Sequence, residues 1–352
     1  ASGAPRAVAA AGTAVAGAAV AGASTSPGSR RMGVACGSGQ QPAGAEGAGA
    51  AGAMAVERKT RPPQRSEGAG FLIVDIMSGI PDERLDPFLI WHELPRSFHP
   101  PGTMPGAPMH PHRGFSECPY AKEMVGKDGP GPMDCFLGKD HEGNKHSMRQ
   151  GDFEFGQVGQ GFMHEGVIDK HWSGYMHFFQ LWINLPRKNK MDPPRIINCA
   201  SAKLPFVEVS ASPKVTVKVL LGENVFGATS PVVSRHVPAQ YLDLELAAGG
   251  QLVHHPPPEM QTRLAYVYRG QPVVGGTRCS AGEFLLLTHG EHLMVEAGRE
   301  DAGLLFIAGR KIGEPIAKHG PFVMNSRAEL DQCMRDFQAK KLCGNMTREV
   351  IA

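Results

Sequence analysis

Charged and bulky apolar side chains are scarce at the beginning of the chain. Residues 1–45 contain no aspartate, glutamate or lysine, and runs of Ala, Gly, Val and Ser such as AVAAAGTAVAGAAVAGAS fill most of this stretch. Such a composition offers too little bulky apolar surface to fold alone, and alanine and glycine contribute too little transfer energy for a membrane span. We therefore expect residues 1–66 to be a low-complexity segment, either disordered or an organelle-targeting peptide.

The targeting interpretation sets the expected location of the protein. Transit peptides are poor in acidic residues and contain arginine, and Arg6, Arg30 and Arg31 are the only charged residues in residues 1–45. If the segment is a transit peptide, we expect import into a plastid or a mitochondrion. Otherwise we expect the protein in the cytoplasm or nucleus.

Cysteine pairs and clusters of one charge sign are also absent. The seven cysteines are far apart, odd in number and without a C-x-x-C pair, which excludes a disulfide framework and a zinc ribbon and favours reduced thiols inside the cell. The 36 basic and 34 acidic residues are scattered along the chain and leave a net charge of +2. No basic stripe of the kind that binds nucleic acid results. We expect a monomer that binds neither nucleic acid nor membranes directly.

Short strand-like segments dominate the rest of the chain. Separated by turn residues, they include FLIVDIM, FFQLWINL, VTVKVLL, YLDLEL, LAYVY, EFLLLT, HLMVEA and GLLFIAG. This pattern predicts an all-β protein of antiparallel strands in barrels or sandwiches. Helical spacing occurs late, in SRAELDQCMRDFQAKK, where Ser326 and Glu329 form a capping box.

A proline-rich stretch divides the β-region in two. The sequence LPRKNKMDPPRI, near residues 185–196, is typical of a connection between two domains of ordinary size. We expect a first β-barrel over residues 67–200, a second over 201–325, and a C-terminal helix over 326–345.

Two histidines in PMHPHRGF are candidates for a metal site. His110 and His112 are two residues apart, so in a strand both imidazoles point to the same face. About fifty residues later, GDFEFGQVGQGFMHEGV contains His164, which a β-barrel that folds back on itself can bring next to them. Three neutral nitrogens and one carboxylate, with open positions left over, suit iron, manganese, copper or nickel better than a closed structural zinc site.

Several motifs together resemble one family. HPHRGF, the later GD…G-x-G-x-x-H, FFQLWINLP…KM-x-P, EPIAKHGPFVMNSRAEL…DF and LDPFLIWHELP are similar to motifs of the pirin family of the cupin superfamily. The resemblance covers roughly residues 70–340. It implies a bicupin fold, that is, two facing β-barrels of the jelly-roll type and a closing C-terminal α-helix. It also implies one non-haem metal in the first barrel, usually Fe(II), with Mn, Cu, Ni and Zn as alternatives, and a metal-free second barrel.

The resemblance assigns three metal ligands and leaves the fourth open. The family's histidine ligands correspond to His110, His112 and His164, whereas its glutamate falls on Gly166. Glu165 is one residue early and reaches a metal only through a bulge.

Glu117 competes with Glu165 for the fourth position, although Pro119 should interrupt its strand; water alone is the third option. We favour Glu165, and either carboxylate is a candidate catalytic base. Arg113, beside the ligands, is expected to hold a carboxylate near the metal.

The resemblance implies two functions of different kinds. Some pirins resemble quercetin 2,3-dioxygenases, in which the metal lowers the pKa of a flavonol hydroxyl, a carboxylate takes the proton and the bound enolate reacts with O2. Met109, Phe115, Phe162 and Met163 would then form the apolar wall for a flat substrate. Alternatively, the chain is a non-catalytic, iron-dependent redox sensor that binds a protein partner.

Overall fold

The computed structural model describes residues 52–67, 70–127 and 136–352, which all fall in one unit of the chain, Gly47–Ala352. Most of the expected targeting segment, up to residue 51, therefore lies outside the described residues. Among the residues that are described, no helix is long and apolar enough to span a bilayer. Five of the seven cysteines lie in the described part, and all five are free thiols.

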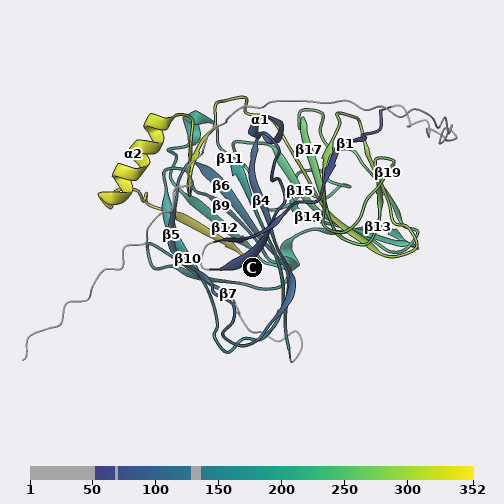
Figure 1. Ribbon diagram of the computed structural model, residues 1–352, viewed down its shortest axis with the longest axis horizontal. Coiled ribbons are helices and arrows are strands. Elements are labelled where there is room, and N and C mark those ends of the chain that lie inside the picture. The colour runs from purple at the N-terminus through teal and green to yellow at the C-terminus, as the bar shows by residue number, and fades with distance from the viewer. Residues whose placement is uncertain (1–51, 68–69, 128–135) are drawn as a thin grey trace, which may run out of the picture. The chain divides into compact units, whose positions relative to one another are not determined.

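The first β-domain consists of two sheets (Figure 1). The order of its eight-stranded sheet is β2 (Gln64–Glu67), β3 (Phe71–Asp75), β4 (Phe88–His99), β11 (Gly174–Asn184), β6 (Phe115–Gly126), β9 (Phe153–Gln157), β12 (Arg195–Cys199) and β25 (Thr347–Ile351). The order of its four-stranded sheet is β5 (Ala107–His112), β10 (Phe162–Ile168), β7 (Phe136–Asp140) and β8 (Lys145–Met148). Every pairing in both sheets is antiparallel except that of β12 with β25.

The second β-domain repeats this arrangement. Its seven-stranded sheet has the order β1 (Val56–Thr60), β20 (Glu283–Leu287), β17 (Thr262–Arg269), β22 (Ala302–Gly309), β15 (Ala239–Leu246), β14 (Lys214–Leu221) and β13 (Phe206–Ala211). Its four-stranded sheet has the order β16 (Gln251–His254), β21 (Leu293–Glu296), β18 (Val273–Val274) and β19 (Thr277–Arg278). The expected all-β fold with two domains of the cupin type is confirmed.

Shorter elements connect and close the two domains. They are α1 (Asp82–Leu85), η1 (Arg187–Asn189), η2 (Ser201–Lys203), the hairpin of β23 (Ala317–His319) and β24 (Phe322–Met324), and α2 (Arg327–Gln338). The proline-rich stretch that the sequence indicated as a connection contains η1 and the first residues of β12.

Each domain receives one strand from the opposite end of the chain. β1 pairs with β20 of the second domain, and β25 pairs with β12 of the first. Both β1 and nearly all of β2 lie inside residues 1–66, which composition assigned to a low-complexity segment. β1 is polar in sequence, VERKT, but its main chain bonds to a preformed sheet edge and the preceding Met54 is only 1% exposed. Sheet pairing thus orders a segment that could not fold alone.

The C-terminal helix begins and ends at recognisable signals. The Ser326 hydroxyl accepts a hydrogen bond from the Glu329 amide at 3.3 Å, as the capping box predicted. The helix ends at Gln338 because Lys340 adopts a positive φ of 57°, and the amides of Lys340 and Lys341 bond back to the carbonyls of Phe337 and Asp336, the pattern of a Schellman motif.

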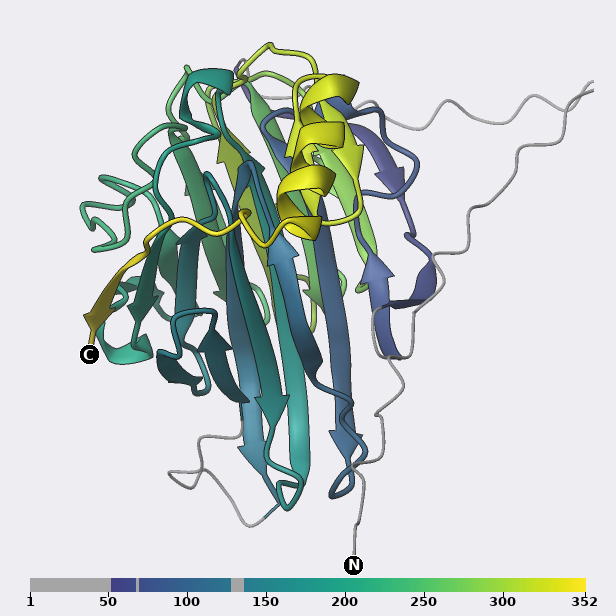
Figure 2. The ribbon, with the colours of Figure 1, turned by 90° about the vertical axis from the view of Figure 1, so that its left-hand side faces the viewer.

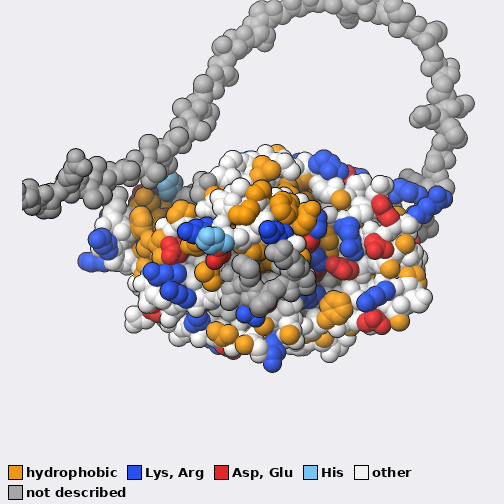
Figure 3. Space-filling view, turned by 90° about the horizontal axis from the view of Figure 1, so that it is seen from below, with side chains coloured by type: hydrophobic (Ala, Val, Ile, Leu, Met, Phe, Trp, Pro, Cys, Tyr) orange, Lys and Arg blue, Asp and Glu red, His pale blue; other side chains and the backbone are white. Residues whose placement is uncertain are grey.

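The chain beyond α2 crosses the strands of the first domain before it forms β25 (Figure 2). On the face seen in Figure 3, positive and negative side chains are interspersed, in line with the net charge of +2.

The two β-domains share one hydrophobic core. Trp91 of β4 makes edge contacts with Tyr241 of β15 and Tyr266 of β17, each at 6.2 Å between ring centroids. Asp243 of β15 is buried and accepts hydrogen bonds from the Tyr120 hydroxyl at 2.7 Å and from Lys122 Nζ at 2.6 Å. These contacts fix the large sheets of the two domains against each other.

Candidate metal centre

Three imidazoles converge between two neighbouring strands. β5 carries His110 and His112, and β10 carries His164, which lies directly opposite His110 in the antiparallel register. The Nε2 atom of His164 is 3.1 Å from Nε2 of His110 and 3.1 Å from Nε2 of His112. One ring nitrogen from each residue lies within 4.8 Å of the others. The H-x-H spacing and the later histidine therefore meet as the sequence predicted.

The protonation states of these histidines suit metal binding. Nδ1 of His110 donates to the Pro108 carbonyl at 2.7 Å, which leaves the Nε2 lone pair directed at the other two rings. Burial lowers the pKa of His110, and it lowers the pKa of His112 and His164 well below the usual value, with further lowering from the neighbouring imidazoles. At neutral pH all three are neutral, which is the form that binds a metal.

Glu117 of β6 approaches the histidines from the large sheet. Its Oε1 atom lies 3.5 Å from Nδ1 of His164, and its Oε2 atom lies 3.9 Å from Nε2 of His112. The side chain is fully buried. Oε2 accepts from Gln180 Nε2 at 3.1 Å, but Oε1 has no hydrogen-bond partner in the described structure. Burial, and then the nearby carboxylate of Glu154, hold the pKa of Glu117 well above its usual value.

Neighbouring residues explain how Glu117 fits. Gly156 lies opposite it on β9, and a Cβ at Gly156 would come within 3.1 Å of Glu117 Cγ, so glycine leaves the space for the carboxylate. Pro119 does not interrupt the strand as we expected. The register of β6 with β11 continues through Pro119, and pairs with β9 are present on either side of it, at Glu117 and Tyr120.

Glu165 has no such contacts. The register of β10 with β5 shifts between His164 and Gly166, but the extra residue is on β5, where Pro108 and Met109 stand opposite Glu165. The strand of Glu165 itself keeps an unbroken register with β7, so the bulge is not where we expected it. Glu165 pairs with Lys139 of β7, and within the described part of the chain its carboxylate makes no ion pair with any of the three imidazoles. Adjacent strand residues face opposite sides, which agrees with this placement. Glu165 as a ligand stays a prediction without a supporting contact, whereas Glu117 has two.

Arg113 has a different role from the one expected. Its guanidinium donates to Asp336 of α2 at 2.6 Å and to the carbonyls of Gln160 and Leu342. It therefore holds the C-terminal helix and the segment after it against the end of β5 and the start of β10, and the carboxylate that it binds is not one beside the histidines.

Aromatic rings surround His112. The ring centroids of Phe115, Phe162 and Trp182 lie 5.4, 6.1 and 5.3 Å from that of His112, and Phe115 stacks on Trp182 at 4.0 Å. Phe115 and Phe162, two of the four residues expected to form an apolar wall, thus contact His112, and both are fully buried. Met109 is 37% exposed because it alternates with His110 along β5. The sequence reasoning missed Trp182, although its alternation with buried core residues in FFQLWINL could have indicated it.

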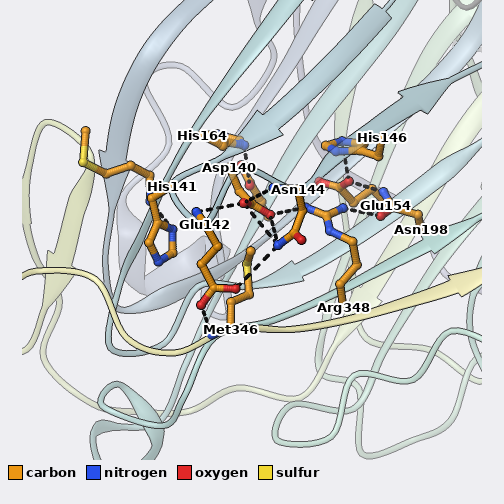
Figure 4. A network of polar contacts seen from close by, with 12 residues as sticks. Asp140, His141, Glu142, Asn144, His146, Glu154, His164, Asn198, Met346 and Arg348 are labelled. Carbon is orange, nitrogen blue, oxygen red and sulfur yellow. Dashed lines mark hydrogen bonds and ion pairs between the residues drawn. The ribbon is translucent and has the colours of Figure 1, made fainter.

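A buried polar network extends from this site to the C-terminal strand (Figure 4). Glu154 of β9 binds His146 of β8 at 3.0 Å and accepts from Asn198 of β12. Arg348 of β25 donates to Asn198 and, at 3.0 Å, to Asp140. Burial raises the pKa of Glu154, but His146 and then Arg348 outweigh it and lower that pKa to about 2. Sequence reasoning missed Glu154, because alternation in FEFG places it on the face opposite Phe153 and Phe155, which is ordinarily the solvent side.

The donor set fits a mononuclear divalent transition metal. Three neutral imidazoles and one buried carboxylate with an unpartnered oxygen match the preference of iron, manganese, nickel or copper for mixed nitrogen and oxygen ligands. His110, His112 and His164 would hold the ion, with Glu117 as the nearest carboxylate. Among the described residues, no other group of three or more such side chains converges in this way.

Known proteins share this architecture. The profile of the Pirin C-terminal cupin domain matches residues 241–343. A Pseudomonas aeruginosa protein, provisionally named a quercetin 2,3-dioxygenase, is 33% identical over 281 residues, covering 78% of this chain and 92% of that protein. Pirin-1 of Arabidopsis thaliana is 32% identical over 292 residues, covering 81% and 93%. The solved structure of a quercetin 2,3-dioxygenase from Acinetobacter baumannii superposes with a TM-score of 0.73 at 25% identity, covering 82% and 98%. The chain therefore belongs to the pirin family of cupin proteins.

Proposed function

We propose that this chain binds one divalent metal ion, Fe(II), through His110, His112 and His164 and uses it for ring cleavage of a flavonol-type substrate by O2. One observation carries the proposal: a buried carboxylate oxygen, Oε1 of Glu117, lies without a hydrogen-bond partner beside three convergent neutral imidazoles. The names of the Pseudomonas relative and the Acinetobacter structure support the substrate class.

Different residues of this chain would have different roles in the reaction. A bound metal supplies Lewis acidity that makes a flavonol hydroxyl easier to ionise. Glu117, ionised beside the bound cation, would receive the hydroxyl proton on Oε1, and its raised pKa makes the carboxylate a stronger proton acceptor. Gln180 holds the other carboxylate oxygen at 3.1 Å and so orients Glu117. Phe162 and Trp182, whose rings contact that of His112, would exclude water from one face of the substrate.

Metal content tests the first half of the proposal. His164→Ala removes the imidazole that touches both others, so bound iron should fall to well below one per chain after anaerobic loading and gel filtration. His289→Ala, at an exposed histidine of the second domain, is the matched control and should keep full metal content. Full iron content in His164→Ala would place the metal elsewhere.

Turnover tests the second half. Protein loaded anaerobically with Fe(II) is mixed with an excess of quercetin and then with air, and the flavonol absorption band is followed. Loss of many equivalents per chain supports the dioxygenase. If the band is unchanged while iron is bound, the enzyme reading is overturned, and the chain is then the iron-dependent binding protein that the pirin resemblance also implied.

A further inference from the structure

The second β-domain contains a pocket that the metal chemistry does not use. Its volume is about 680 Å³, within the range of roughly 300 to 1,000 Å³ that small-molecule sites occupy. The inner part is formed by Gln240 of β15 and Arg263 of β17, and the outer part by Glu223, Glu291 and the run Pro256–Pro258. None of the residues that line it belongs to the first domain.

Arg263 is a buried cation without a carboxylate partner. The residue is 1% exposed, and burial lowers the pKa of its guanidinium. Nε donates to the Met260 carbonyl at 3.0 Å and Nη1 to the Gly290 carbonyl, but no described acidic side chain forms an ion pair with it. Burying a charge without a counter-charge is costly. An anion in the pocket would remove that cost.

One nitrogen of Arg263 remains available to such an anion. Nη2 makes no hydrogen bond with any described residue. The buried polar atoms without a partner do not include it, so this nitrogen is accessible. Since Arg263 lines the pocket, this donor faces the open space.

Gln240 supplies a second donor on the same face. Gln240 and Arg263 both lie opposite Ala308 of β22, one on each neighbouring strand, so their side chains leave the sheet on the same side. Only the alanine methyl group stands between them. The Gln240 carbonyl oxygen is 2.9 Å from Nε2 of the buried His254, and the Gln240 amide nitrogen has no partner in the described chain. Two donors thus flank a gap above Ala308.

The outer part of the pocket has the opposite character. Glu223 and Glu291 are exposed acidic residues, which accept hydrogen bonds from hydroxyl groups and repel a second anionic group. Pro256, Pro257 and Pro258 add a rigid apolar surface, against which a flat ring can pack. The pocket is therefore polarised, with cationic and amide donors inside and acceptors outside.

We propose that this pocket binds a small hydroxylated aromatic carboxylate. The carboxylate lies between Arg263 and Gln240, with one oxygen accepting from Nη2 of Arg263 and the other from the Gln240 amide. The ring lies along the three prolines, and the hydroxyl group donates to Glu223 or Glu291. This site is separate from the histidine cluster, so it does not depend on the function proposed for that cluster.

Calorimetric titration of the iron-loaded protein with 4-hydroxybenzoate tests the proposal. The neutral analogue 4-hydroxybenzamide has nearly the same shape, and we expect it to bind at least about tenfold more weakly, because it brings no negative charge to pair with the Arg263 guanidinium. Equal affinity for the two compounds, or no saturable binding of 4-hydroxybenzoate, overturns the proposal.

Variants locate the binding. Arg263→Gln and Gln240→Leu should each weaken 4-hydroxybenzoate binding by about tenfold or more, whereas Arg278→Gln, at an exposed arginine that does not line the pocket, should leave it unchanged. If Arg263→Gln fails to fold, Gln240→Leu and the benzamide comparison still decide. His164→Ala should bind 4-hydroxybenzoate normally, and a loss there would assign the binding to the first domain and overturn the proposal.

Discussion

In the candidate metal centre, several buried polar atoms lack good hydrogen-bond partners. Nε2 atoms of three neutral histidines face each other, and at least one of each facing pair presents a lone pair. Oε1 of Glu117 is buried without a donor, which costs about 1–3 kcal/mol. A cation at the point of convergence satisfies all of these atoms together. Metal binding should therefore stabilise the fold.

Glutamine substitutions distinguish the two candidate carboxylates. Glu117→Gln keeps the shape of the side chain but removes its charge beside the histidines, so we expect metal affinity to fall about 10- to 100-fold. Glu165→Gln is the matched control and should bind as the parent does, because Glu165 makes no ion pair with the described histidines. Equilibrium dialysis against Fe(II) under anaerobic conditions measures both affinities. A larger loss in Glu165→Gln would restore the assignment that the sequence favoured.

At the scale of the element, β25 is held by a polar contact deep in the first domain. Arg348 reaches Asp140 at 3.0 Å and Asn198 of the neighbouring strand, while Asp140 also accepts the amides of Glu142 and Asn144 at 3.0 Å. The Asp140 side chain is completely excluded from solvent. The strand thus depends on one buried ion pair as well as on its parallel ladder with β12.

Removing Arg348, the partner of the buried Asp140, should lower the free energy of unfolding far more than removing Arg195, the partner of the half-exposed Glu349. Arg348→Met leaves Asp140 without its counter-charge, and we expect the free energy of unfolding to fall by about 3 kcal/mol. Arg195→Met removes a neighbouring pair with the half-exposed Glu349 and should cost less than about 1 kcal/mol. Urea denaturation of both variants measures the difference. Equal small losses would mean that the ladder alone holds β25.

The same pair gives β25 a dependence on pH. Burial raises the pKa of Asp140, but hydrogen bonds from Asn144 and Arg348 outweigh it and leave the pKa below its usual value. A lowered folded pKa means that the carboxylate stabilises the fold fully above its unfolded pKa of about 3.9 and loses this effect as the pH falls through the lower folded value. The stability gap between the parent and Asp140→Asn should therefore be constant from pH 7 to about 5 and close below about 4. A gap that persists at pH 2 would contradict this assignment.

Local sequence patterns predicted the strands and the C-terminal helix better than they predicted which strands pair with one another. Alternation and turn residues indicated the strands, and Ser326 with Glu329 indicated α2, because these signals depend on neighbours in sequence. Pairing depends on distant residues, so the ladder of β1 with β20 could not be read from VERKT. The choice between Glu117 and Glu165 likewise depended on Gly156, which is 39 positions from Glu117 and makes room for it. Spacing and strand alternation alone aligned His110 and His112, whereas His164 was predictable only because the resemblance to pirins supplied the pairing of its strand with theirs.

At the scale of the molecule, the described domains are interlocked. β1 completes a sheet of the second domain and β25 a sheet of the first, so each domain contains a strand that is distant in sequence from the rest of that domain. The core between the large sheets contains residues of both domains, among them Trp91, Phe179, Tyr241 and Tyr266. Asp243 accepts hydrogen bonds from Tyr120 and Lys122 of one domain and from Tyr268 of the other. Neither domain can open without exposing the shared core.

Unfolding should therefore occur in one step that both domains share. All three tryptophans, Trp91, Trp172 and Trp182, lie in the first domain, so their fluorescence follows that domain, whereas far-UV circular dichroism follows the strands of both. We expect the two signals to give the same midpoint in urea, as for a cooperative transition. Asp243→Ala removes the acceptor of two cross-domain donors, Tyr120 and Lys122, and should lower both midpoints together, by an amount that corresponds to about 3 kcal/mol. Two separated midpoints in the parent protein would show that the domains unfold independently despite their exchanged strands.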